Sequence, residues 1–326
     1  MRAFVWTRYG PPSGLELREL AKPTPKATEL LIRIRATTVT AGDAEIRSFR
    51  VPRFLWLPLR LYTGLTRPRR RILGQELAGE VESVGRDVKG FRPGDQVLAT
   101  TGLRFGAYAE YACLPEESRD GVVGLKPANL TYEEAAAVPT GGLEALHLLK
   151  TGKLQTGTQI LINGAGGSIG TFAVQLAKYY RAEVTAVDSL EKLDMLRSIG
   201  ADRVIDFARE DFTRNGQVYD VILDVTGRIP LSPILRSLKS NGRCLLANPR
   251  LSDMVRGLWV SKTSHKKVMF GASNERADEL RVLTKLIETG ELRPVIDRIY
   301  PFEKIPEAHG YVDGGHKKGN VAITVA

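Results

Sequence analysis

The sequence predicts an α/β protein with two domains, one mostly β and the other a doubly wound parallel sheet. Its 326 residues exceed the ~100–200 residues of an average domain. The first 120 residues read as short strands separated by turns, and from about Leu130 strands alternate with helical segments. With 43% hydrophobic and 26% charged residues, the chain has a globular composition, which excludes a disordered or fibrous protein.

The N-terminal part carries the pattern of β-formers alternating with polar residues. The predicted strands are Leu30–Thr40, Glu76–Val84, Gln96–Thr100 and Ala107–Leu114. Turn signals such as Gly85-Arg86-Asp87 and Pro93-Gly94-Asp95 follow the second of these strands. We therefore expect a mostly β unit here.

The central part carries the alternation of strands and helices. Thr131 followed by Glu134 is a capping box, which predicts the start of a helix. Further predicted helices are Thr171–Tyr179, Leu190–Ile199 and Asn274–Glu288. The predicted strands are Gln159–Asn163, Glu183–Val187, Arg203–Ile205, Val221–Val225, Arg243–Ala247 and a closing strand Val321–Val325. Strands and helices in this order indicate a parallel sheet with helical crossovers.

The sharpest motif is a glycine-rich turn between a buried strand and a helix. Gly164, Gly167 and Gly170 follow the strand directly, although the usual G-x-G-x-x-G spacing is absent. A diphosphate must approach the backbone closely at a helix N-terminus, where free N–H groups and the helix dipole favour anions. The turn therefore predicts dinucleotide binding, and the alternative is a tight strand–helix turn without a ligand.

The residues after the second strand bear on the choice of dinucleotide. Asp188 comes 18 positions after Gly170, where an acid commonly binds the adenosine ribose hydroxyls and favours NAD. Ser189 and Lys192 follow, and these two residues could instead hold a 2′-phosphate. The coenzyme is therefore expected to be NAD or NADP, with the balance toward NAD.

The net charge and the cysteine content limit which partners, metal sites and cellular compartment the protein can have. The formal net charge is +10, which suits an anionic partner such as a nucleotide. Two cysteines, Cys113 and Cys244, exclude a disulfide scaffold and a four-thiolate zinc site, and the four histidines lack metal-ligand spacing. We see no targeting segment or membrane span, and we expect a cytoplasmic protein.

The set of motifs resembles the medium-chain dehydrogenase/reductase superfamily, and most closely its zinc-free quinone oxidoreductase, or zeta-crystallin-like, branch. The matching segments are Gly74–Val81, Phe91–Val97, Gly106–Tyr111, Glu134–Thr140 and Gly164–Gly170. The resemblance implies a GroES-like β domain (residues 1–125 and 270–326) with an inserted Rossmann domain (126–269). It also implies hydride transfer from a nicotinamide coenzyme.

The resemblance also implies coenzyme contacts and the absence of a metal. The predicted coenzyme-binding residues are Thr140, Gly164, Gly167, Ser168, Ile169, Gly170, Asp188, Ser189, Lys192, Thr226, Asn248, Lys318 and Asn320. Zinc-dependent members of the superfamily have thiolate or imidazole ligands where Thr40, Gln75 and Thr140 stand here. Hydroxyl and amide groups do not suit Zn²⁺, so no catalytic zinc and no other metal is expected.

Without a Lewis acid, a conjugated acceptor is easier to reduce than a simple carbonyl, because charge spreads onto a distant oxygen. We therefore predict an NAD(P)H-dependent, zinc-independent oxidoreductase that transfers hydride to a quinone, an enone or another activated carbonyl. Thr40 and Tyr62 are the candidate catalytic hydroxyls. The polar Asn and Tyr that the branch commonly has at the positions of Thr40 and Glu45 are missing, which leaves the proton donor open.

The segment from Ile46 to Gln75 has no counterpart in the family pattern. It contains eight arginines and no acid, namely Arg47, Arg50, Arg53, Arg60, Arg67, Arg69, Arg70 and Arg71. Interleaved apolar residues, among them Phe54, Trp56 and Leu57, favour a lid over a hydrophobic planar substrate, with solvated arginines. The alternative is a segment that binds single-stranded nucleic acid or a membrane surface. The alternative function is a nucleotide-binding crystallin-like or RNA-contacting protein with little catalytic activity. We expect neither a membrane nor a nucleic acid as partner.

Relatives in this superfamily usually dimerise by joining the edges of two Rossmann sheets. Here that edge would involve Gly242–Ala247 and the segment up to Phe270. Met254, Val255, Leu258, Trp259 and Val260 offer apolar surface nearby. The sequence therefore predicts a homodimer.

Overall fold

The chain folds into two compact units, and the second is inserted into the first. The computed structural model describes residues 1–69, 71–271, 273 and 275–325. The first unit comprises Met1–Thr140, Asn274–Thr289 and Pro294–Ala326, and the second comprises Gly141–Ser273 and Gly290–Arg293. The domain boundaries expected from the family resemblance, at residues 125/126 and 269/270, stay a prediction.

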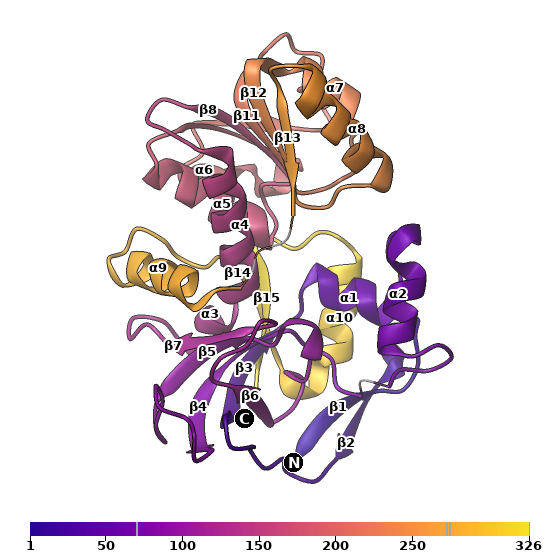
Figure 1. Cartoon of the computed structure of the whole chain (residues 1–326), viewed down its shortest axis with the longest axis vertical. Coiled ribbons are helices and arrows are strands. Elements are labelled where there is room, and N and C mark those ends of the chain that lie inside the picture. Colours follow the sequence, from indigo (N-terminus) through magenta and orange to yellow (C-terminus); the bar gives the residue numbers. More distant parts are fainter. Residues whose placement is uncertain (70, 272, 274, 326) are drawn as a thin grey trace. The chain divides into compact units, whose positions relative to one another are not determined.

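The second unit is built on a parallel six-stranded sheet (Figure 1). Its strands are β8 (Gln159–Asn163), β9 (Glu183–Asp188), β10 (Arg203–Asp206), β11 (Tyr219–Asp224), β12 (Leu238–Leu246) and β13 (Lys267–Phe270). The spatial order is β10-β9-β8-β11-β12-β13, and every neighbouring pair is parallel. This is the 3-2-1-4-5-6 order of a Rossmann sheet. Successive strands are added toward one edge from β8 to β10 and toward the other edge from β11 to β13, so the strand order reverses between β8 and β11. The predicted α/β class with a doubly wound parallel sheet is confirmed.

Helices precede and connect these strands. They are α4 (Pro139–Gly152), α5 (Ser168–Tyr179), the 3₁₀ helix η3 (Leu190–Lys192), α6 (Leu193–Ser198), α7 (Leu231–Arg236) and α8 (Leu251–Thr263). α5 begins three residues earlier than predicted, directly after the glycine-rich turn. Leu161, Ile222 and Cys244 on three adjacent strands form part of the buried core of this unit.

The first unit is built on a seven-stranded mixed sheet and a separate two-stranded one. Its strands are β1 (Arg2–Trp6), β2 (Leu15–Glu19), β3 (Glu29–Thr38), β4 (Glu76–Val84), β5 (Gln96–Thr100), β6 (Tyr111–Pro115), β7 (Val122–Leu125), β14 (Ile296–Pro301) and β15 (Asn320–Thr324). The order of the large sheet is β14-β15-β3-β4-β5-β7, with β6 pairing with β3, and only β14 and β15 run parallel among its described pairs. The β-rich N-terminal part is therefore as predicted, and residues from near the C-terminus complete its sheet.

The helices of the first unit are short. They are η1 (Pro12–Gly14), α1 (Ala41–Ser48), α2 (Arg53–Thr63), η2 (Gly102–Arg104), α3 (Tyr132–Ala136), α9 (Ala277–Glu288), η4 (Phe302–Lys304) and α10 (Ile305–Asp313). The capping box predicted at the start of α3 is confirmed, because Thr131 Oγ1 accepts the Glu134 N–H at 3.2 Å and the Glu134 carboxylate accepts the Thr131 N–H at 2.9 Å. Among the described residues, no helix is long and apolar enough to cross a bilayer.

The first part of the arginine-rich segment lies in two helices, the end of α1 and the whole of α2. α1 ends at a left-handed Phe49, with φ of 57°, and α2 begins after Pro52. Pro58 lies inside α2, so this proline is tolerated within the short helix. Arg70, one of the eight arginines, lies outside the described residues.

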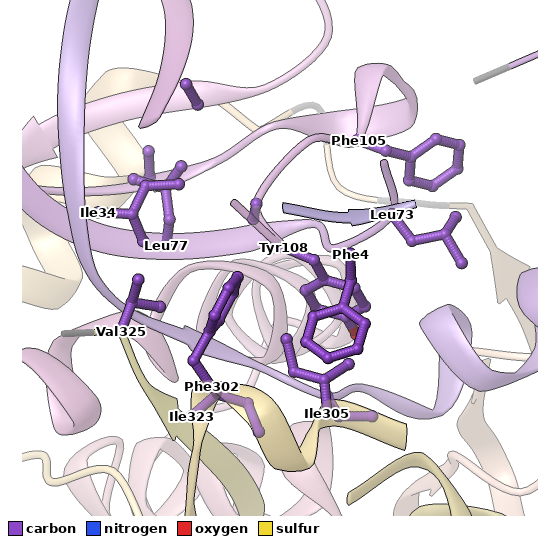
Figure 2. Close-up of a cluster of buried hydrophobic side chains, with 14 of the residues drawn as sticks. Phe4, Ile34, Leu73, Leu77, Phe105, Tyr108, Phe302, Ile305, Ile323 and Val325 are labelled. Carbon is purple, nitrogen blue, oxygen red and sulfur yellow. The ribbon is translucent and has the colours of Figure 1, made fainter. Parts of the chain in front are cut away.

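The core of the first unit packs both ends of the chain together (Figure 2). Phe4 and Phe302 meet edge to face, with ring centroids 5.4 Å apart. Ile34 on β3 and Leu77 on β4 are fully buried in the same cluster. Tyr108 also lies in this core, and its hydroxyl is buried without a hydrogen-bond partner among the described residues.

Candidate functional site

The turn between β8 and α5 is closely packed on its inner side. Gly164 has φ of +82°, and a Cβ there would lie 2.8 Å from the Thr226 side chain. A Cβ on Gly170 would overlap the carbonyl oxygens of Gly164 and Ala165. Both positions therefore require glycine, because any side chain would force the strand, the turn and the helix apart.

The same turn is open at the N-terminus of α5. Gly167 is the N-cap residue of this twelve-residue helix, and a Cβ there would meet no atom closer than 3.7 Å. A side chain at Gly167 would occupy the space that an approaching ligand needs. Backbone N–H groups and the helix dipole favour an anion at such a terminus. The turn therefore fits a diphosphate.

Asp188 ties this turn to the end of β9. Its Oδ2 accepts the Gly166 N–H at 2.7 Å, and its Oδ1 accepts the Ser189 N–H at 2.9 Å. Oδ1 also lies 3.1 Å from the ammonium nitrogen of Lys192, and both side chains are buried. A Cβ on Gly166 would lie 2.5 Å from the Lys192 side chain, so this glycine makes room for the ion pair. The carboxylate thus fixes the turn and neutralises the neighbouring cation.

A polar network closes the other side of the turn. Asn163 Nδ2 donates to Asp224 Oδ1 at 2.9 Å and to Thr226 Oγ1 at 3.1 Å. Thr226 in turn donates to Asp224 Oδ1 from its hydroxyl, at 2.8 Å, and from its N–H, at 3.1 Å. Asp224 Oδ2 is buried and has no hydrogen-bond partner within the described part of the chain. The sequence analysis did not select Asn163, although a polar residue that ends a buried strand next to glycines was the available signal.

Asn248 lies beside the same network. Its Nδ2 donates to the Val225 carbonyl oxygen at 2.7 Å, which joins the end of β11 to the segment after β12. The second unit therefore brings together ten of the predicted coenzyme residues at the carboxyl ends of its strands. They are Gly164, Gly167, Ser168, Ile169, Gly170, Asp188, Ser189, Lys192, Thr226 and Asn248.

The remaining predicted residues lie in the first unit. The Lys318 N–H donates to Asp297 Oδ2 at 3.0 Å, and Asn320 donates to the Val295 carbonyl oxygen from its backbone and its side chain. Thr40 caps α1, because its Oγ1 accepts the Asp43 N–H at 3.0 Å and donates to Asp43 Oδ2 at 2.7 Å. The Tyr62 hydroxyl donates to the Leu103 carbonyl oxygen at 3.0 Å. The functional roles of these residues stay predictions.

Two buried carboxyl groups accompany Thr40 and Thr140 in the first unit. Glu76, the first residue of β4, accepts the Thr140 N–H at 2.8 Å and a short hydrogen bond from the Thr38 hydroxyl. Burial raises the pKa of Glu76 to about 7, although its hydrogen bonds to Thr38 and Thr140 lower it. Burial likewise raises the pKa of Asp43 to about 6, and the bonds from Thr40 oppose that shift. Neither acid is among the site residues that the sequence predicts, and the partners of Glu76 cannot be assigned from local patterns, because Thr38 and Thr140 lie 38 and 64 positions away.

Comparison with known proteins assigns the chain to a family. The family model "Alcohol dehydrogenase GroES-like domain" matches residues 26–126, and the model "Zinc-binding dehydrogenase" matches residues 199–323. A chloroplast envelope quinone oxidoreductase homolog of Arabidopsis thaliana is 30% identical over 341 residues, covering 99% of this chain and 98% of the relative. The chain belongs to the medium-chain dehydrogenase/reductase superfamily.

Further relatives of this superfamily member are reductases by name. An NADPH-dependent alkenal/one oxidoreductase, chloroplastic, of Arabidopsis thaliana is 29% identical over 336 residues, covering 99% of this chain and 79% of the relative. The solved quinone oxidoreductase from Coxiella burnetii superposes with a TM-score of 0.87 at 27% identity, covering 100% of this chain and 99% of that structure. The predicted resemblance to quinone oxidoreductases is confirmed.

The donor set of this superfamily member does not fit zinc, even though one of its family models is named for that metal. Thr40, Gln75 and Thr140 offer hydroxyl and amide groups, and Thr40 is already bonded to Asp43. In the described ranges, no group of three or more His, Cys, Asp or Glu side chains is arranged to hold a metal ion.

The raised pKa of Glu76 predicts a pH-dependent contribution to stability. A folded-state pKa of about 7, against 4.5 for the free carboxyl group, means that the folded protein holds a proton that the unfolded chain releases. This stabilisation is complete below pH ~4.5 and is lost as the pH rises through ~7. Glu76→Gln removes the titrating group, so the free energy of unfolding of the wild type should fall relative to that of the variant across this range.

Urea denaturation at intervals between pH ~4.5 and ~8 measures this difference. Glu82→Gln, at an exposed acid of the same strand, is the control, and its profile should parallel that of the wild type. Parallel profiles for the wild type and Glu76→Gln would contradict the expectation. Asp43 adds a contribution of the same sign in all three proteins.

Proposed function

We propose that this protein is an NAD(P)H-dependent, zinc-independent oxidoreductase that transfers hydride to a quinone, an enone or another activated carbonyl. The observation that carries the proposal is the glycine turn from Gly164 to Gly170, which opens α5 at the carboxyl end of β8. This turn lies where a Rossmann sheet reverses its strand order, the usual place for a dinucleotide. The names of the relatives, quinone oxidoreductase and alkenal/one oxidoreductase, support the acceptor class.

The residues of the turn perform the binding steps. The N-terminus of α5 holds the coenzyme diphosphate, and Gly167 leaves room for it. Asp188, Ser189 and Lys192 lie where the adenosine ribose is bound in a Rossmann fold. Thr226 and Asn248 complete the coenzyme-binding side of the second unit at the carboxyl ends of β11 and β12. The buried Asp224 holds Thr226 in place. When bound, the nicotinamide supplies the hydride.

The acceptor chemistry follows from the polar groups available. Hydride addition to a quinone or enone carbon moves negative charge to an oxygen, and a hydroxyl donor can stabilise that charge without a metal. Thr40 and Tyr62 are the proposed donors. Both hydroxyls make intramolecular hydrogen bonds, so either one must exchange its acceptor to serve the substrate.

A panel of acceptors tests the proposal directly. Oxidation of NADH and NADPH should proceed with quinones and enones, and a zinc chelator should leave the rate unchanged. Gly167→Asp places a negative side chain at the N-terminus of α5, and it should weaken coenzyme binding at least tenfold. Activity confined to simple alcohols and abolished by the chelator would reject the proposal.

We further propose that Asp188 biases the coenzyme choice toward NAD. Its carboxylate opposes a 2′-phosphate, while Lys192, 3.1 Å away, attracts one. Asp188→Gly should release the lysine and improve the kcat/KM ratio of NADPH to NADH by about tenfold, the factor that ~1.4 kcal/mol gives. Asp194→Gly, at an exposed acid in α6, is the control.

Lys192→Met provides the converse measurement. Loss of the ammonium group should lower the same kcat/KM ratio, because the remaining carboxylate then repels the 2′-phosphate. A ratio that stays unchanged in both variants would show that the ion pair does not face the ribose.

A homodimer is proposed on the exposed edge of the second unit. β13 is the last strand of the six-stranded sheet, so its outer edge has no partner strand in the described chain. On the adjacent α8, Val255, Leu258 and Trp259 are exposed, and a second copy could cover them. Light scattering at micromolar concentration should return twice the chain mass of 35.9 kDa. Trp259→Asp should shift this mass toward the monomer, and a wild-type mass near 35.9 kDa would exclude the dimer.

A reducing compartment, such as the cytoplasm, is proposed on the cysteine content. Cys113 and Cys244 are both free thiols, and burial raises the pKa of Cys113 to about 11. Thiols of this kind stay protonated and unreactive. They neither need nor indicate an oxidising environment.

A further inference from the structure

Helix α2 turns one arginine inward and leucines outward. Leu57 and Leu61 are 55% and 57% exposed, and Leu65 just beyond the helix is 53% exposed. Arg60, by contrast, places its guanidinium 3.7 Å from the ring centroid of Tyr9 and 4.1 Å from that of Phe49. A surface helix ordinarily buries its apolar face and exposes its charges, so α2 is reversed.

Several contacts hold α2 in this orientation. The Tyr9 hydroxyl lies 2.8 Å from Thr63 Oγ1 and donates to the Gly64 carbonyl oxygen at 2.6 Å. The rings of Phe49 and Trp56 meet edge to face, with centroids 6.0 Å apart. The inward side of the helix is thus fixed by aromatic, cation–π and hydrogen-bonding contacts. The outward leucines are therefore a consequence of how the helix is anchored.

Not all arginines of this segment are solvated, contrary to the lid interpretation. Arg47 is buried, donates to the Gly10 carbonyl oxygen and pairs with Asp313, which also pairs with Arg50. Arg50 is exposed but paired, and the other exposed arginines in the described part of the segment are Arg53, Arg67, Arg69 and Arg71. None of these four forms an ion pair within residues 1–69, 71–271, 273 and 275–325. They lie before and after an apolar surface on a stretch of 30 residues without an acid.

Contrary to the expectation from the sequence that no membrane is a partner, we propose that this surface docks the protein onto an anionic lipid membrane. The docking surface, called the α2 patch, consists of Phe54, Leu55, Leu57, Leu61 and Leu65 with Arg53, Arg67, Arg69 and Arg71. The apolar side chains enter the boundary between headgroups and acyl chains, and the arginines bind the anionic headgroups. With eleven residues α2 is too short to span a bilayer, so it lies in the interface.

The charge of the patch distinguishes a membrane from other occupants. A second copy bound across a twofold axis would bring arginines against arginines, which is repulsive. Single-stranded nucleic acid would use the arginines and stack on aromatic rings, but it would leave the outward leucines exposed to water. An anionic bilayer satisfies both the cations and the leucines. This inference is independent of the proposed reductase activity.

Vesicle co-sedimentation of the full-length protein tests the proposal. The probes are vesicles of phosphatidylcholine alone and of phosphatidylcholine with phosphatidylserine, each at low and high salt. The protein should bind the mixed vesicles, bind the neutral ones far more weakly, and detach from the mixed vesicles as salt increases. Wild-type protein that stays in the supernatant with the mixed vesicles at low salt would overturn the proposal.

Paired variants separate the two contributions. Arg67→Gln/Arg69→Gln should lower the partition coefficient about 25-fold, because each arginine near an anionic surface contributes about fivefold. Arg86→Gln/Arg281→Gln removes the same charge from exposed sites elsewhere and should have a much smaller effect. Equal losses in the two double variants would mean that only net charge matters, and this would overturn the α2 patch.

Leu57→Gln/Leu61→Gln tests insertion of the helix. It should weaken binding at least tenfold, whereas Leu125→Gln/Ile299→Gln, at residues 59% and 56% exposed, should bind like the wild type. Circular dichroism and the thermal midpoint check that each variant is folded. If the leucine double variant is not folded, the arginine double variant decides whether the proposal holds. Undiminished binding of a folded leucine variant, or binding to RNA in place of vesicles, would overturn the proposal.

Discussion

The close approach of three backbone segments at the β8–α5 turn is the constraint on which the second unit depends. The carbonyl oxygen of Gly164 occupies the place where a side chain of Gly170 would begin, and Gly164 itself is pressed against Thr226. Because the turn is so tight, Asp188 can reach across to the Gly166 N–H and Asn163 can reach Asp224. The same closeness starts α5 directly after the strand and leaves its N-terminus open for an anion.

Features that depend on neighbouring residues in the chain were predictable from the sequence. The glycine turn, the acid that ends β9 and the capping box of α3 each follow from a few adjacent residues. The doubly wound parallel sheet follows from the alternation of strands and helices along the chain. Glu76 was not predictable in this way, because its partners Thr38 and Thr140 lie 38 and 64 positions away.

Long-range pairing also decides which arginines are available at the surface. Arg47 forms an ion pair with Asp313, 266 positions away, and Arg60 stacks on Tyr9. No periodicity in the Ile46–Gln75 segment distinguishes these two arginines from the six others. The lid interpretation treated all eight arginines as solvated, because the composition of a segment gives the number of charged side chains but not their contacts. The structure separates the engaged Arg47 and Arg60 from Arg53, Arg67, Arg69 and Arg71, which are exposed and, among the described residues, without an ion-pair partner. The charges of these four arginines contribute to the field outside the protein.

The buried carboxyl group of Glu76 contributes to stability and also connects β4 to the start of α4. Glu76 begins β4 and accepts the N–H of Thr140, the residue at which the first unit ends and α4 continues into the second. The positive end of the α4 dipole favours the ionised carboxylate, while burial favours the protonated one. Burial prevails, which places the pKa near neutrality. Since the acceptor oxygen persists in either form, the hydrogen bond to Thr140 weakens on protonation but is not lost. The start of α4 therefore stays anchored to β4 across the pH range in which Glu76 titrates.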